Sequence, residues 1–93
     1  MEIVVAIKLL NGDDVIGKLV SNKTDNTIIT LEDPRVMMPT QNGLGLVPLM
    51  IANPDAEVSI NRSAISVNEI SVVGELEKAY LQQVSKLDLT MMR

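Results

Sequence analysis

The sequence of 93 residues contains no cysteine, no histidine, no phenylalanine and no tryptophan. Without cysteine the chain can form neither a disulfide nor a thiolate site, a composition that fits the reducing cytoplasm. Without histidine and cysteine it lacks the side chains that most readily act as base or nucleophile near neutral pH. We therefore expect a cytoplasmic protein that is not an enzyme and that needs neither a cofactor nor a metal ion.

The only aromatic residue is Tyr80, although 46% of the residues are hydrophobic. The core must then consist of Val, Ile, Leu and Met side chains, which suit a small β barrel. A chain of this length forms one domain with one core. No apolar run approaches the roughly 20 residues that a membrane span requires, and the start Met1-Glu2-Ile3 lacks the basic region of a secretory signal. We expect no membrane association.

Positive charge is also scarce, since 8 basic residues face 12 acidic ones and the net charge is −4. Nonspecific affinity for nucleic acids comes mainly from Lys and Arg side chains that neutralise phosphates. The composition therefore argues against broad electrostatic binding of nucleic acid, unless an oligomer gathers the scattered basic residues into one patch.

The clearest local pattern is a predicted β-hairpin near the start of the chain. Alternating apolar residues in Val5–Leu10 lead to Asn11-Gly12, and alternation resumes in Val15–Leu19. This combination is the strongest short-range signal for a hairpin. Gly17 lies within the second strand, where a glycine permits a sharp bend or a close approach of another backbone.

Further runs along the chain predict a mainly β protein. The expected strands are 3–10, 15–20, 27–38, 46–51, 57–60 and 65–72. Pro34 requires an edge, a bend or a bulge in the third of these. We expect Thr40–Gly45 to be a long flexible connection and Asn61–Ala64 to be a short polar tip between strands.

After Gly74 the apolar period changes from two residues to that of a helix. The apolar face of the expected helix is formed by Leu76, Ala79, Tyr80, Val84 and Leu87. Acidic residues in its first turn complement the helix dipole. The predicted organisation is therefore a β unit over 1–73, a helix over 74–87 and a frayed tail over 88–93.

The hairpin Val5–Leu10, Asn11-Gly12 and Val15–Leu19, followed by the polar loop and strand Thr24–Leu31, resembles the first motif of the Sm-like family (Sm, LSm and bacterial Hfq). The chain is similar to short viral and environmental members with a proline-rich third strand and a trailing helix. The family's second motif has an Arg-Gly tip. The similar stretch here is Ile60–Ala64, which lacks the glycine and shifts the arginine by one position.

This resemblance implies a small SH3-type barrel of about five bent antiparallel strands with a C-terminal helix. It also implies a homo-oligomeric ring, in which strand four of one copy pairs with strand five of the next. The matching edges would be 47–51 or 57–60 on one side and 65–72 on the other. In the family the ring binds single-stranded RNA, and by resemblance Asp25 and Asn26 would contact a base edge while Arg62 would contact phosphate or a neighbouring base.

The residues themselves leave alternatives open. Asp25-Asn26 is also a typical turn that hydrogen-bonds its own backbone, and Arg62 would then lie on a solvated hairpin tip. No aromatic residue lies near either loop to stack a base, a contact that contributes about 1–3 kcal/mol per base. The alternative function is a homo-oligomeric structural or protein-interaction scaffold without RNA binding. The alternative to a ring is a monomer whose sheet edge is covered by the C-terminal helix.

Overall fold

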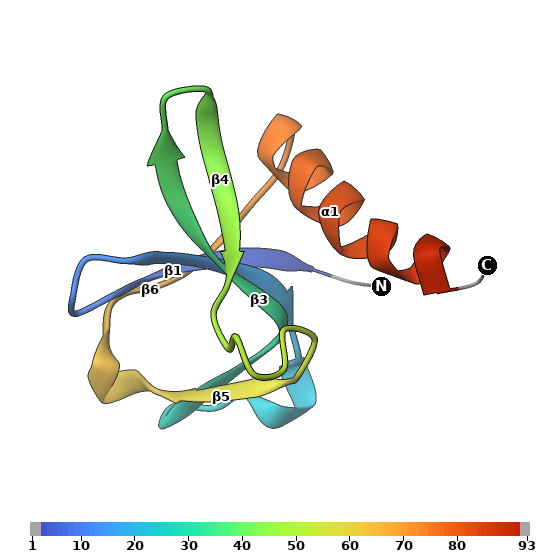
Figure 1. Cartoon of the computed structure of the whole chain (residues 1–93). Coiled ribbons are helices and arrows are strands. Elements are labelled where there is room, and N and C mark those ends of the chain that lie inside the picture. Colours follow the sequence, from blue (N-terminus) through green and yellow to red (C-terminus); the bar gives the residue numbers. More distant parts are fainter. Residues whose placement is uncertain (1–2, 92–93) are drawn as a thin grey trace.

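The computed structural model describes the backbone of residues 3–91 and the side chains of residues 3–84 (Figure 1). It is mainly β, with one C-terminal helix and two short 3-10 helices, η1 and η2. The elements are β1 (Val4–Leu9), β2 (Asp14–Leu19), η1 (Ser21–Lys23), β3 (Ile28–Thr40), β4 (Gly43–Pro48), β5 (Val58–Asn61), η2 (Arg62–Ala64), β6 (Ile65–Ser71) and α1 (Glu75–Met91).

All six strands belong to one antiparallel sheet with the order β4-β3-β2-β1-β6, and β5 pairs with the first part of β3. The sheet is open, and its six strands agree in number with the six runs in the sequence, one more than the about five strands that the resemblance implies. The extra strand arises because β4 and β5 pair with different parts of the long strand β3, at residues 35–40 and 28–31. The two outer strands of the main path are β4 and β6.

The predicted first hairpin is confirmed by the pairing of β1 with β2. Asn11 Oδ1 accepts a hydrogen bond from the Asp13 backbone N–H at 2.9 Å, and Gly12 has a φ of 94°. Gly17 serves the predicted close approach, because a Cβ added there would lie 3.1 Å from the Cβ of Leu31 in β3.

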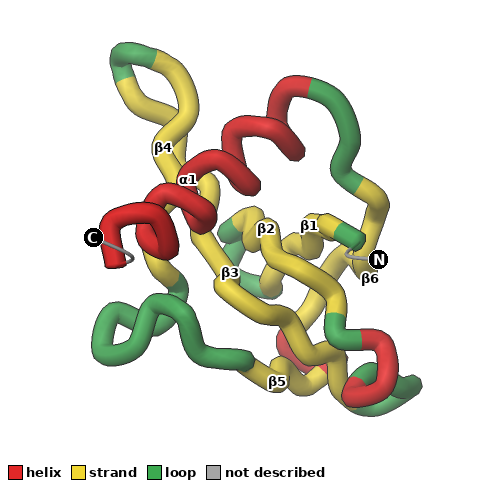
Figure 2. Tube along the Cα trace, turned by 90° about the vertical axis from the view of Figure 1, so that its right-hand side faces the viewer, coloured by secondary structure: helices red, strands yellow, loops and turns green. Residues whose placement is uncertain are grey.

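Alternation along the strands places apolar side chains on both faces of the sheet. The outer face, which α1 covers, carries the cluster Val4, Ala6, Ile16, Val72, Tyr80 and Val84. The inner face carries the cluster Val5, Ile7, Val15, Ile29 and Leu31. In both views α1 and β5 lie on opposite sides of β1 and β2 (Figures 1 and 2). The core therefore consists of two layers, one on each face of the sheet. The layer under α1 contains Tyr80, and the other is built from aliphatic side chains alone.

The helix is fixed to the sheet at a β-bulge next to Pro34. Ile16 pairs with Arg35 and Lys18 pairs with Glu32, so β3 has one residue more than β2 in this stretch. The extra residue is Asp33, which adopts a φ of 52°. The pattern around Pro34 thus predicted the irregularity correctly, and the structure shows it to be a bulge inside a continuous strand.

The hydroxyl of Tyr80 in α1 donates to the bulge carbonyls of Glu32 and Asp33 at 3.1 and 2.8 Å. Burial raises the pKa of this hydroxyl, so it stays protonated and available as a donor. The single aromatic residue therefore combines a fully buried ring with a specific hydrogen-bond anchor.

Three local predictions were wrong. The segment Thr40–Gly45 is no long connection, because β3 and β4 stay paired up to Thr40 and Gly43 and form a projecting hairpin (Figure 1). The helix continues to Met91, beyond the expected end at residue 87, while 92–93 of the predicted tail lie outside the described residues. The tip at 61–64 joins two strands that pair with different neighbours, so it is a corner and not a hairpin tip.

Among the described residues, no helix has both the length and the apolar character needed to cross a membrane.

Candidate functional site

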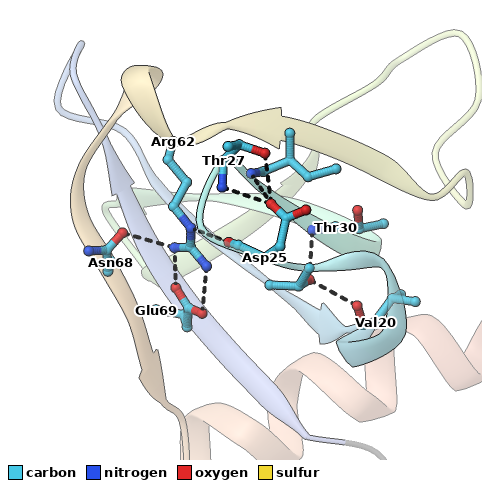
Figure 3. A network of polar contacts seen from close by, with 9 residues as sticks. Val20, Asp25, Thr27, Thr30, Arg62, Asn68 and Glu69 are labelled. Atoms are coloured by element: carbon cyan, nitrogen blue, oxygen red, sulfur yellow. Dashed lines mark hydrogen bonds and ion pairs between the residues drawn. The ribbon is translucent and has the colours of Figure 1, made fainter.

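Asp25 and Arg62, two of the residues expected to bind RNA, lie where the loop before β3 meets η2 (Figure 3). Arg62 Nε donates to the backbone carbonyl of Asp25 at 2.8 Å, although the two residues are 37 positions apart in sequence. Asn26 is exposed beside them. Within the part of the chain whose side chains are described, its side chain makes no hydrogen bond. The structure thus brings Asp25 and Arg62 together and leaves Asn26 accessible.

The Asp25 carboxylate is used by its own loop. Its Oδ1 accepts hydrogen bonds from the Thr27 backbone N–H at 2.7 Å, the Thr27 hydroxyl at 2.7 Å and the Ile28 backbone N–H at 3.0 Å. The Thr27 backbone N–H and the other donors hold the pKa of this carboxyl below its ordinary value of 3.8. These bonds confirm the interpretation of Asp25-Asn26 as a backbone-bonded turn.

Arg62 pairs with β6. Its guanidinium binds both carboxylate oxygens of Glu69, at 2.7 and 3.1 Å, and donates to Asn68 Oδ1 at 2.9 Å. This two-point geometry is the strongest form of a charged hydrogen bond. The side chains of Arg62 and Glu69 are 21% and 25% exposed, so Arg62 is partly buried and paired with a carboxylate. The hydrogen bond from Arg62 holds the pKa of Glu69 below its ordinary value of 4.5.

We call Asp25, Arg62, Asn68 and Glu69 the corner region. Its four hydrogen bonds from Arg62 occupy four of the five N–H donors of a guanidinium. Little donor capacity therefore remains for a phosphate. The geometry makes Arg62 a tie between the loop, η2 and the outer strand β6, and this tie fixes where β6 lies.

The sequence analysis assigned no role to a second arginine, Arg35. Its side chain is 2% exposed and lies beside the bulge. The guanidinium donates to the Pro54 carbonyl at 2.8 Å and reaches Asp55 Oδ1 only at 3.4 Å, while its Nε is buried without a partner. We call Asp33, Arg35 and Tyr80 the bulge region. The one sequence signal for it was an arginine directly after a proline inside an apolar run.

The two outer strands expose apolar side chains. On the β3–β4 hairpin these are Met38, Leu44 and Val47, which are 49%, 52% and 39% exposed. On β6 they are Val67 and Ile70, which are 46% and 59% exposed. The hairpin belongs to a stretch, residues 36–54, that has no charged residue. In β6 the only charged residue is Glu69, whose carboxylate is paired with Arg62.

A notch of about 130 Å³ opens beside the outer strand β6. It is lined by Ala6, Ile7, Lys8, Asp14, Val67 and Ile70. Lys8 and Asp14 form an ion pair at 2.9 Å, so the charged atoms of the lining neutralise each other. The remaining wall is apolar.

The described residues contain no group of three or more side chains placed to hold a metal ion. Comparison of the sequence with models of known protein families gave no match, and comparison with curated proteins gave none either.

Proposed function

We propose that this chain is a non-catalytic, self-assembling protein of the cytoplasm that forms a homo-oligomeric scaffold of Sm-like architecture. The observation that carries the proposal is the pair of outer strands, β4 and β6, each with exposed apolar side chains and almost no charge.

An outer strand presents unpaired backbone groups and is a ready template for another strand. Monomeric proteins protect such strands with charges, with bulges or by covering them. On β4 the protection amounts to Pro48, which has no N–H, and one hydrogen bond from Gln83 of α1 to the Leu46 carbonyl at 2.9 Å. On β6 it amounts to register irregularities against β1. Outer strands with exposed apolar side chains, whose one charged residue is already paired within the chain, support pairing between copies.

The strand order supports an Sm-like assembly. The resemblance names 47–51 or 57–60 as one edge and 65–72 as the other. Strand β6 matches 65–72, β4 overlaps 47–51 at Val47 and Pro48, and β5 matches 57–60 but pairs with β3 off the main path of the sheet. A contact between different edges of two copies is heterologous, and it closes into a ring when the rotation between copies permits. The bulge in β3 and the pairing of this strand with β2, β4 and β5 support a bent, barrel-like sheet.

The mass of the particle in solution tests this proposal. At micromolar concentration we expect an oligomer for the natural sequence and a monomer for Val47→Asp, because a charge on β4 would be buried in the contact. The control is Asn22→Asp in η1, which adds the same charge at an exposed position that belongs to neither outer strand. A natural chain that is monomeric under these conditions would refute self-assembly.

RNA binding is the second candidate function. The contact between the Asp25 backbone and Arg62 favours it, because it places an exposed Asn26 at the meeting point of the two implied RNA-binding segments. Anisotropy titrations of labelled oligo-U and oligo-A at two salt concentrations test it. We expect Asn26→Ala to weaken base-specific binding and leave the fold intact. Binding that ignores Asn26 and fades steeply with salt would be charge attraction alone, and no binding by the assembled oligomer would reject this candidate.

A further inference from the structure

The notch beside β6 lies on the outer face of the sheet. Ala6 pairs with Ile70, and Lys8 pairs with both Asp14 and Val67, so these side chains share one face. Ala6 belongs to the outer cluster under α1, which identifies that face. The small Ala6 side chain forms the floor, and the exposed Val67 and Ile70 form the wall next to the free edge. A strand that pairs with β6 would place its side chains directly over this notch.

The directions of the strands decide which face of a second copy arrives there. Four antiparallel steps separate β4 from β6 in the order β4-β3-β2-β1-β6, so the two strands run in the same direction. A second copy can pair its β4 antiparallel to β6 only when it is turned over about an axis across the strands. Its inner face then continues the outer face of the first copy. Antiparallel pairs are the more stable per residue.

The inner face of β4 is identified by the register with β3. Val47 pairs with Val36, which packs against the inner cluster, whereas Leu46 pairs with Met37 on the outer face. Leu44 lies two residues before Leu46 on the same strand, so its side chain is also on the outer face. Met38 shares the inner face with Val47, and the residue opposite it on β4 is Gly45. The exposed inner-face side chains at this edge are therefore Val47 and Met38.

We infer that Val47 of a second copy fills the notch over Ala6, between Val67 and Ile70, with Met38 of that copy alongside. The inference rests on the proposed self-assembly and names the residues that meet. The sizes agree, since a cavity of about 150 Å³ holds one benzene molecule and the notch of about 130 Å³ suits one branched aliphatic side chain. The charges are compatible as well. The stretch 36–54 contains no charged residue, and the two charged residues of the notch, Lys8 and Asp14, form an ion pair with each other.

Cysteine cross-linking tests the contact without background, because the chain has no cysteine of its own. Val47→Cys and a size-tagged Ile70→Cys are purified separately, mixed in urea under reducing conditions, refolded together so that the copies assemble at random, and oxidised. We expect a mixed disulfide dimer on a non-reducing gel. The matched control mixes Leu44→Cys with the same Ile70→Cys protein. Leu44 is on the same strand and more exposed than Val47, but it lies on the opposite face, so we expect at least a fivefold lower yield.

The outcomes separate the two proposals. Preferential cross-linking of Leu44 would mean that β4 arrives without being turned over, and equal yields would mean that neither face is preferred. Either result would refute the inference while self-assembly stands. Oligomers that cross-link through neither position would refute it in the same way. A monomeric mass for all variants and for the natural chain would refute self-assembly itself. Val67→Cys in place of Ile70→Cys repeats the test if one variant fails to fold.

Discussion

The bulge region and the corner region each use an arginine to join segments distant in sequence, but the arginines have opposite surroundings. Arg35 is 2% exposed, and its carboxylate partner Asp55 is 55% exposed at 3.4 Å. Arg62 is 21% exposed and holds Glu69 through two bonds, the shorter being 2.7 Å. The more buried cation therefore has the weaker ion pair. Arg35 donates two hydrogen bonds to backbone carbonyls, those of Pro34 and Pro54, and one long bond to the Asp55 carboxylate.

This difference shows that the two regions hold different outer strands by different forces. The bulge region combines an apolar ring, a buried guanidinium and backbone acceptors, and it fixes α1, whose Gln83 reaches β4. The corner region relies on charge and fixes β6. Substitutions and pH should therefore affect the two regions unequally.

The largest effect is expected at Tyr80, the anchor of the bulge region. Tyr80→Ala removes a fully buried ring and should lower the free energy of unfolding by about 3–5 kcal/mol, as other aromatic truncations do. Tyr80→Phe keeps the ring but leaves the Glu32 and Asp33 carbonyls without their donor, at a cost of about 1–3 kcal/mol. Urea titration at fixed protein concentration measures both. Equal losses for the two variants would show that the hydroxyl alone anchors the helix.

Replacing each of the two arginines with methionine compares directly how much each region contributes to the free energy of unfolding. Arg35→Met removes the cost of burying a cation and leaves its partner Asp55 in solvent, so it creates no unpaired buried carboxylate. The lost bonds to the Pro34 and Pro54 carbonyls cost about 0.5–1.5 kcal/mol each, so we expect little net change. Arg62→Met should destabilise the folded protein, because it leaves the half-buried Glu69 carboxylate without its cation.

The urea midpoints of the two methionine variants check this contrast. The reverse order, with Arg35→Met the less stable protein, would mean that the carbonyl bonds of Arg35 outweigh the cost of burying its charge.

A weaker effect is expected from pH, and it should arise mainly in the corner region. The pKa values of Asp25 and Glu69 are lowered in the folded protein, below 3.8 and 4.5. The unfolded chain then binds protons more readily, so this stabilisation is fully present above about pH 5 and is lost as pH falls through the lowered values. Thermal unfolding between about pH 6 and 3 measures the loss. In Glu69→Gln the decline should be shallower, and an unchanged decline would assign it to other groups.

Sequence reasoning succeeded where a signal was local. The alternation around Asn11-Gly12 predicted the first hairpin, the helical period predicted α1, and Pro34 predicted an irregular β3. It failed at 40–45, where two glycines suggested flexibility. The register of β4 on β3 decided that segment instead, through contacts between residues that local patterns do not link.

The candidate site shows the same division. The turn at Asp25 was predictable because its acceptor and donors lie within three residues. The partners of Arg62 were not, since Glu69 reaches it only because η2 turns a corner and β6 returns along β1. Arg35 was missed because its acceptors come from a loop about 20 residues away. An isolated glutamate in the apolar strand 65–71 was the one signal for an ion pair.

The smallest effect on stability is expected at Gln83, where the helix held by the bulge region reaches the outer strand β4. Gln83→Ala removes one exposed hydrogen bond to the Leu46 carbonyl and should change the free energy of unfolding by no more than about 0.5 kcal/mol, as for most surface substitutions. Its effect on assembly should be clearer, because the freed carbonyl becomes available to a strand of a second copy. Concentration-dependent mass measurement should show the oligomer of Gln83→Ala persisting to lower protein concentration. Gln82→Ala, one position along the same helix and also exposed, is the matched control. Weaker assembly of Gln83→Ala would mean that the helix and β4 must stay joined for copies to associate, and that the bulge region supports the β4 edge instead of competing for it.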